Sequence, residues 1–181
     1  METRPEFQPG SSVIYGIHGK CSILSVEQRS AGGQSVHYYK LEPVKSSFSR
    51  SQRQEPSIWV PVSSAQEKGL RTPMTAADFE TCMDLVRSRE YYFLLDQPWT
   101  TLQNQLETTI RTEGAVGLTK VLSFLFVLRK RQLAPHGETN RMYETVSKLL
   151  IREMADATQQ APRAIEDQIA KAIRTKLTPN H

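Results

Sequence analysis

The sequence predicts an α+β protein in which a small β-barrel over residues 1–72 precedes an all-helical domain over residues 73–181. Three observations predict this class. Apolar and polar residues alternate in short runs up to residue 62, as in half-buried strands. Turn pairs such as Pro9-Gly10 separate these early runs. After Gly69-Leu-Arg71-Thr-Pro73 the apolar residues recur every three or four positions, as in helices.

The first domain carries four predicted strands, separated by turns and one long loop. The strands cover residues 13–15, 21–27, 36–44 and 58–62. Ala31-Gly-Gly33 predicts a hairpin turn between the second and third strands. Alternation along the third strand places two sets of residues on opposite faces: Val36, Tyr38 and Lys40 against His37, Tyr39 and Leu41. Pro61 cannot donate to a sheet ladder and favours an edge strand, whereas the Ser- and Arg-rich residues 45–57 predict a surface loop.

The second domain carries five predicted helices. They cover residues 75–89, 99–112, 118–133 and 138–156, with a last helix that Pro162 opens. Thr75 and Asp78 have the spacing of a capping box. Gly114 and Gly117 loosen the junction between the second and third helices, and the apolar residues 91–95 predict a short connection that packs between the domains.

Composition indicates a soluble globular protein. Hydrophobic residues make up 38% of the chain and charged residues 23%, which argues against global disorder. A net charge of +4 is compatible with a nucleic-acid partner but does not identify one. Cys21 and Cys82 suggest neither a disulfide framework nor a zinc site. The start of the chain lacks an apolar leader, and the longest apolar run, residues 121–128, is too short to span a bilayer. We therefore expect a cytoplasmic protein with no membrane partner.

Catalytic patterns are missing from the sequence. It contains no recognisable nucleophile–base pair, phosphate loop or metal-ligand cluster. His18 stands beside Gly19 and has no partner Ser or Cys at a recognisable spacing, so we interpret it as a turn residue. The sequence predicts a protein that is not an enzyme and that uses no cofactor or metal.

The motifs of the first domain resemble the RNA-polymerase-interacting domain of the CarD/CdnL family of bacterial transcription regulators. The residues that carry the resemblance are Phe7, Gly10, Val13-Ile-Tyr15, His18-Gly19, Val26-Glu27, Arg29, Trp59-Val-Pro-Val62 and Gly69-Leu-Arg71. A looser similarity continues through Trp99, the apolar helix 118–133 and the helix 138–156 that contains Leu149-Leu-Ile-Arg-Glu153.

This resemblance implies a fold and a function for each domain. The first domain would be a Tudor-like barrel that docks on the β subunit of RNA polymerase, with Arg29, Trp59 and Pro61 at the interface. The alternatives are that Trp59 closes one end of the barrel and that Arg29 is a solvated hairpin charge. The helical domain would contact promoter DNA at the upstream edge of the melted region, where Trp99 would wedge into the minor groove.

The cations near the predicted wedge are unevenly distributed. None of residues 100–105 is cationic, so phosphate contacts would have to come from residues further along the chain: Arg111, Lys120, Arg129, Lys130 and Arg131. Two alternatives stay open, namely that Trp99 packs in the helical core and that residues 129–131 only complement a helix C-terminus.

Together these features predict a regulator, expected to be monomeric, that binds the polymerase β subunit and modulates open-complex stability. The alternative is a polymerase-bound adaptor of the same fold whose helical domain does not bind DNA.

Overall fold

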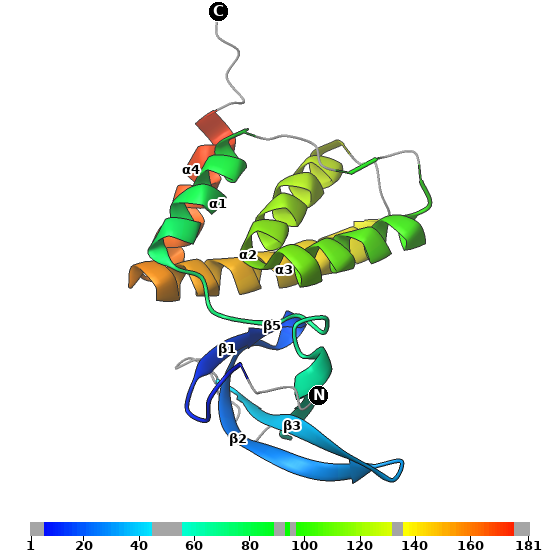
Figure 1. The fold of residues 1–181 in the computed structure, drawn as a ribbon. Coiled ribbons are helices and arrows are strands. Elements are labelled where there is room, and N and C mark those ends of the chain that lie inside the picture. The colour runs from blue at the N-terminus through cyan, green and yellow to red at the C-terminus, as the bar shows by residue number, and fades with distance from the viewer. Residues whose placement is uncertain (1–5, 45–55, 89–92, 95–96, 132–135, 176–181) are drawn as a thin grey trace, which may run out of the picture. The chain divides into compact units, whose positions relative to one another are not determined.

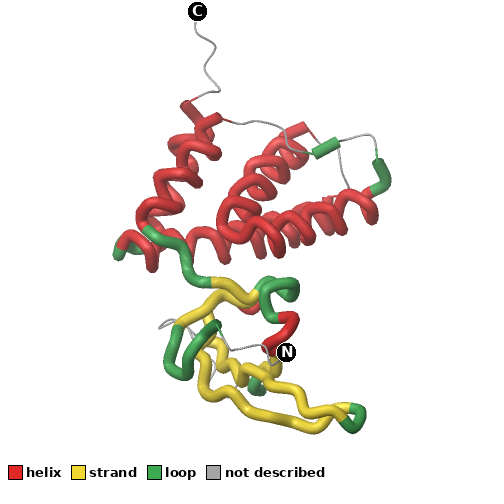
Figure 2. Tube along the Cα trace, in the orientation of Figure 1, coloured by secondary structure: helices red, strands yellow, loops and turns green. Residues whose placement is uncertain are grey.

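The computed structural model describes residues 6–44, 56–88, 93–94, 97–131 and 136–175 (Figure 1). Much of the predicted connection 91–95 and most of the predicted loop 45–57 lie outside these residues. The chain divides into two compact units, Met1–Pro73 and Met74–His181, and each has its own hydrophobic core. The strands belong to the first unit and the long helices to the second, which confirms the α+β class (Figure 2).

The first unit is a five-stranded antiparallel sheet with the order β4-β3-β2-β1-β5. The strands are β1 (Ser12–Tyr15), β2 (Gly19–Ala31), β3 (Gln34–Pro43), β4 (Ile58–Pro61) and β5 (Leu70–Arg71). The predicted closed barrel is not observed. Within the described residues, β4 and β5 are the two edges of the sheet and do not pair with each other, so the sheet is open. Strand β5 was not predicted, because two residues are too few to show an alternation of apolar and polar side chains.

Tyr39 lies at the centre of the core of this sheet. It is 1% exposed, and its ring meets that of Phe7 edge to face with the centroids 5.9 Å apart. The Phe7 amide donates a hydrogen bond of 3.2 Å to the Tyr39 hydroxyl. Gly10, at φ 87°, then turns the chain so that its amide reaches the Ile23 carbonyl at 2.8 Å. The segment before β1 is thereby attached to the sheet.

The second unit contains four helices around a single core. They are α1 (Ala76–Ser88), α2 (Trp99–Arg131), α3 (His136–Thr158) and α4 (Pro162–Thr175). The predicted capping box opens α1, because the Thr75 amide donates to Asp78 at 2.8 Å and the Asp78 amide donates to Thr75 at 3.2 Å. The core residues of α4 are Ile165, Ile169 and Ile173, as their spacing of four predicts.

A buried carboxylate anchors the start of this unit. Glu153 of α3 is 6% exposed and accepts a 2.9 Å hydrogen bond from the amide of Met74, 79 positions earlier in the chain. The Met74 side chain is itself buried in the helical core. Glu153 therefore stabilises the point at which the chain enters the helical unit.

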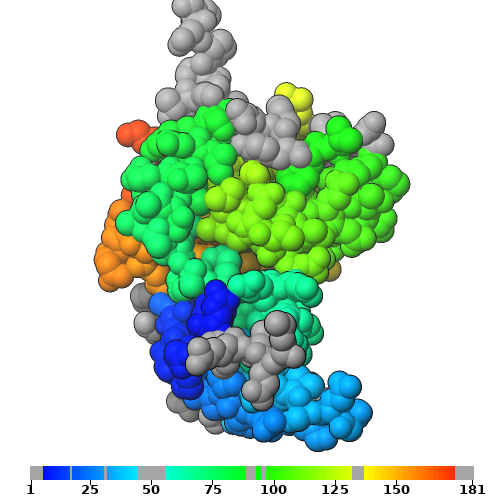
Figure 3. Space-filling model, in the orientation of Figure 1, coloured from blue at the N-terminus to red at the C-terminus, as the bar shows by residue number. Residues whose placement is uncertain are grey.

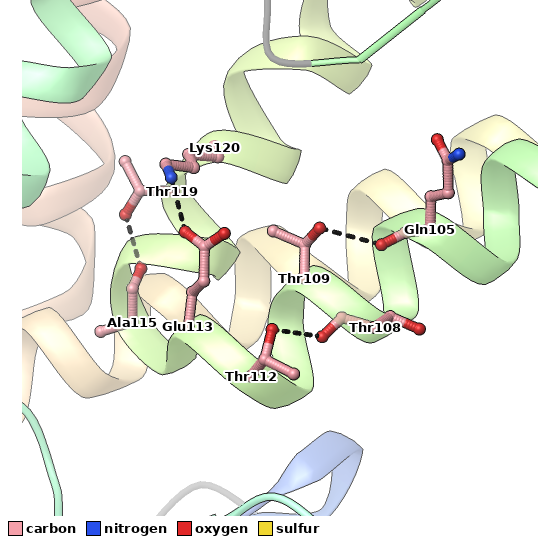
Figure 4. A network of polar contacts seen from close by, with 8 residues as sticks. All are labelled: Gln105, Thr108, Thr109, Thr112, Glu113, Ala115, Thr119 and Lys120. Carbon is pink, nitrogen blue, oxygen red and sulfur yellow. Dashed lines mark hydrogen bonds and ion pairs between the residues drawn. The ribbon is translucent and has the colours of Figure 1, made fainter.

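The two helices predicted on either side of Gly114 are the two halves of α2, and a sharp break at Gly114 separates them (Figure 4). Gly114 has φ 59° and ψ −127°, a conformation that residues with a Cβ rarely adopt. Lys120 and Glu113 form an ion pair of 2.5 Å across the break. The two halves approach closely, because a Cβ added at Gly117 would overlap the backbone carbonyl of Thr109.

We expect Gly117→Ala to destabilise the helical unit by about 1–3 kcal/mol, because the added methyl group has no room. Gly137→Ala is the matched control, since Gly137 lies in α3 with nothing within 4 Å of an added Cβ. That substitution should be neutral or stabilise by up to about 1 kcal/mol through helix propensity. Urea unfolding followed by circular dichroism at the helical band measures both. Equal stability of the two variants would contradict the close approach.

Candidate macromolecule-binding surface

The outer face of the sheet opposes the face that forms the core. In β3, Tyr39 and Leu41 are buried, so Tyr38 and Lys40 point the other way. This is the predicted division of faces in that strand. The register with β4 pairs Lys40 with Trp59 and Tyr38 with Pro61. Trp59 and Pro61 therefore lie on the outer face, two positions apart on one strand.

Arg29 and Trp59 are in direct contact on this outer face. The guanidinium carbon of Arg29 lies 3.3 Å from the centroid of the Trp59 ring, although β3 separates their strands. The Lys40 ammonium lies 5.4 Å from the same centroid. Two cations thus approach one indole, an arrangement that the negative face of an aromatic ring favours.

A carboxylate also lies beside Arg29. Glu27 lies 3.7 Å from the Arg29 guanidinium and accepts a 2.8 Å hydrogen bond from the hydroxyl of Ser25. The side chains of Arg29 and Glu27 remain 49% and 41% exposed. An Arg that contacts both an aromatic ring and a carboxylate has lost part of its rotamer freedom, so less entropy would be lost when a partner binds.

The strand that carries Trp59 lies at an edge of the sheet. Within the described residues β4 pairs only with β3. Beyond β4, the hairpin of β2 and β3 continues as a two-stranded ribbon through the pairs from Gln28–His37 to Ala31–Gln34. Figure 3 shows this hairpin tip projecting from the rest of the sheet unit. An open edge next to an aromatic anchor and an arginine has the composition of a protein-binding surface.

Trp99 packs on the side of α2 that faces the helical core. It is partly buried there, and Leu102 and Leu106, three and seven positions later, are buried on the same side. Its indole Nε1 is buried and has no hydrogen-bond partner among the described residues. Trp99 was expected either to wedge into DNA or to pack in the helical core, and this geometry corresponds to packing in the core.

The structure does not gather the predicted DNA-binding cations into one patch. Arg111 is exposed on the first half of α2, whereas Lys120 lies past the break and is paired with Glu113. Residues 129–131 follow Lys120 by nine or more positions, about 14 Å along the helix axis. They form the last turn of α2, where the helix dipole favours cations.

Two of these terminal cations contact aromatic rings of the helical unit. The Arg129 guanidinium lies 4.1 Å from the centroid of Tyr143, and the Lys130 ammonium lies 5.6 Å from that of Phe126. Arg131 is exposed. Packing within the unit thus accounts for much of the positioning of this basic segment.

Three specific features were not found in the described part of the chain: a metal-binding cluster, a disulfide and a membrane-spanning helix. No group of three or more His, Cys, Asp or Glu side chains there could hold a metal ion. Cys21 and Cys82 are both buried, and neither forms a disulfide. None of the described helices is sufficiently long and apolar to cross a membrane.

The family resemblance singled out Arg29, Trp59 and Pro61 as interface residues, but it did not point to the side chains that contact Arg29 and Trp59. Alternation placed Lys40 on the same face of its strand as Tyr38, but only the register with β4 shows that Lys40 lies opposite Trp59. Glu27 and Ser25 share the outer face with Arg29, because they precede it by two and four positions in β2. This spacing of two residues along the strand is the sequence signal from which the shared face could have been predicted.

Comparison with known proteins gave no match: no protein-family model and no curated protein matches the chain.

We expect Arg29→Ala to expose Trp59 without unfolding the sheet unit. The chain has two tryptophans, so a Trp99→Phe background leaves Trp59 as the only indole fluorophore. Acrylamide quenching of Trp59 should rise, and the free energy of unfolding should fall by about 0.5–1 kcal/mol, the range for an exposed cation–π contact. Lys68→Ala removes a charge from an exposed turn of the same unit and should change neither value. Unchanged quenching in Arg29→Ala would show that the two side chains do not stack in solution.

Proposed function

We propose that this protein is a non-enzymatic transcription regulator that docks on the β subunit of bacterial RNA polymerase. Arg29, Trp59 and Pro61 would form the interface, and the sheet unit would serve as the Tudor-like docking module of the CarD/CdnL family. The helical unit would contact promoter DNA and modulate the stability of the open complex. The protein would act in the cytoplasm, as a monomer.

The observation that carries this proposal is the contact between Arg29 and Trp59. Three residues that the family resemblance assigns to polymerase docking come from strands β2 and β4, and they lie on one exposed face of the sheet. Trp and Arg are the residues that most often dominate the energy of protein interfaces. An edge strand beside them could also pair with a strand of the partner.

A second candidate function is supported by the geometry of Trp99. In a polymerase-bound adaptor, the helical unit would bind another protein or none, and it would leave DNA uncontacted. Trp99 packs on the helical core with a buried indole nitrogen, and the charge of Lys120 is balanced by Glu113. Both features reduce what these two residues could offer to DNA.

We expect Arg29→Ala and Trp59→Ala each to weaken binding to core RNA polymerase by about tenfold or more, as at an interface hot spot. Immobilised polymerase and the full chain, measured by surface plasmon resonance, give the affinities. Lys68→Ala is the charge-matched control and should bind like the original chain. Circular dichroism establishes that each variant is folded. A folded chain that fails to bind polymerase would refute the proposed function.

The adaptor differs from the DNA-contacting regulator in its effect on promoter complexes. If the chain is an adaptor, polymerase saturated with it should form open complexes with an unchanged lifetime. If the helical unit contacts promoter DNA, the lifetime should change, and the change should be lost in Arg29→Ala at concentrations where that variant leaves polymerase unoccupied. A competitor-challenge assay on a promoter fragment measures this lifetime.

A further inference from the structure

The first half of α2, residues 99–113, contributes little to the core of the helical unit. Of these residues, all of which the structure describes, Leu102 and Leu106 are buried. After the break at Gly114, residues 115–131 contribute nine buried residues. Segments with few buried apolar side chains open at a lower free energy than the rest of a protein. The first half of α2 is therefore the less firmly packed of the two halves.

The composition of this half also disfavours a helix. Five of its residues are threonines, namely Thr100, Thr101, Thr108, Thr109 and Thr112. Threonine is a poorer helix former than Ala, Gln, Glu or Lys. The hydroxyls of Thr109 and Thr112 donate to backbone carbonyls four residues earlier at 2.9 Å, a contact that slightly destabilises a helix (Figure 4). The helical state of residues 99–113 therefore depends on packing more than on propensity.

Trp99 adds an unfavourable term at the start of this half. Its side chain packs against the helical core, and its indole Nε1 is buried without a hydrogen-bond partner among the described residues. A buried donor that has lost its water without gaining a partner costs free energy. When the indole leaves the core, Nε1 regains a partner in water. The apolar contacts of the ring thus favour the packed position of Trp99, whereas its nitrogen disfavours it.

The ends of this half allow it to move separately from the second half. Gly114 has non-helical φ and ψ angles, so unwinding that begins at Trp99 need not pass the break. Two polar contacts at the ends hold the segment. Gln97 donates to Gln105 at 2.8 Å, and Glu113 pairs with Lys120. Both contacts are partly exposed to solvent and stabilise the segment only weakly.

We propose that the first half of α2 is a conformational switch that releases Trp99 from the core by local opening. This inference rests on the proposed function, in which the helical unit contacts promoter DNA, and it concerns the regulation of that contact. In the closed form the indole packs on the helical core and is not available to DNA. In the open form it can wedge between base steps. The fraction of open chains therefore limits the apparent affinity of the DNA contact.

Hydrogen exchange of the full chain, followed by mass spectrometry under native conditions, measures the opening. Amides 103–113 should exchange at least tenfold faster than amides 118–128, because the first half opens without the second. The first turn of α2 is left out of the comparison, since its amides lack helical acceptors in the closed form as well. Equal exchange in the two halves would overturn the inference.

Two double variants shift the opening equilibrium in opposite directions at the same exposed positions. Thr101→Ala with Thr108→Ala introduces better helix formers, whereas Thr101→Gly with Thr108→Gly introduces poorer ones. Amides 103–113 should exchange about twentyfold more slowly in the alanine variant than in the glycine variant. Both variants lack the same two hydroxyls, so the loss of a hydroxyl contact would not separate them.

The lifetime of the open complex connects this opening to function. In the competitor-challenge assay with polymerase saturated by each variant, the alanine variant should change the lifetime less than the original chain, and the glycine variant more. The two effects should differ by up to about twentyfold, in line with the open fractions. The matched control combines Thr81→Ala and Thr145→Ala, exposed threonines of α1 and α3. It should leave both the exchange of amides 103–113 and the lifetime unchanged.

The two double variants also give the results that contradict the switch. Equal lifetimes in the alanine and glycine variants, or a smaller effect of the glycine variant, would show that opening does not permit the DNA contact. A polymerase-bound chain that leaves the lifetime unchanged would contradict it as well and support the adaptor. Failure of the proposed function is separate, because polymerase binding is measured without DNA and every variant should retain it. If the folded chain does not bind polymerase, the exchange data still decide whether the segment opens.

Discussion

The burial of Tyr39 determines how the rest of the sheet unit is arranged. Its ring fills the core against Phe7, and its hydroxyl satisfies the Phe7 amide. Side chains alternate along a strand, so a shift of one residue would move every neighbour to the opposite face. With Tyr39 inside, Tyr38 and Lys40 must lie outside, and the pairing with β4 then brings Trp59 to the same surface. The burial of Tyr39 therefore determines both the core of the sheet unit and the residues on its candidate docking face.

Periodicity in the sequence was enough to predict the elements but not their partners. The alternation at 36–41 correctly separated the two faces of the strand, and the spacing of four correctly placed Ile165, Ile169 and Ile173 on one side of a helix. The structure shows which of these faces are buried. Strand register depends on contacts between residues distant in the sequence, so the contact between Arg29 and Trp59 was not predicted; the resemblance only assigned both residues to one interface. The open sheet was missed for a related reason: closure depends on whether two short edge strands meet, and neither β4 nor β5 carries a pattern that reports this.

For the helical unit, the sequence carried a signal for the position of Trp99. Trp99, Leu102 and Leu106 are spaced as one apolar stripe, which places the indole with the core. The same stripe determines which side of the helix is exposed. Gly114 was expected only to loosen a junction, but its non-helical backbone conformation turns the chain sharply between the two halves of α2. A glycine in a sequence gives no direction for such a turn, because the direction is set by the packing of the two halves.

The attachment of Met74 to Glu153 has a consequence for the order in which the protein forms during synthesis. The sheet unit is complete once residue 73 has left the ribosome, and its core needs nothing from later in the chain. The helical unit is different, since its first residue binds a carboxylate 79 positions later and its core includes Ile173 of the last helix. Domains generally fold as units during translation. The module with the candidate docking face can thus be folded while the helices that follow it are still being made.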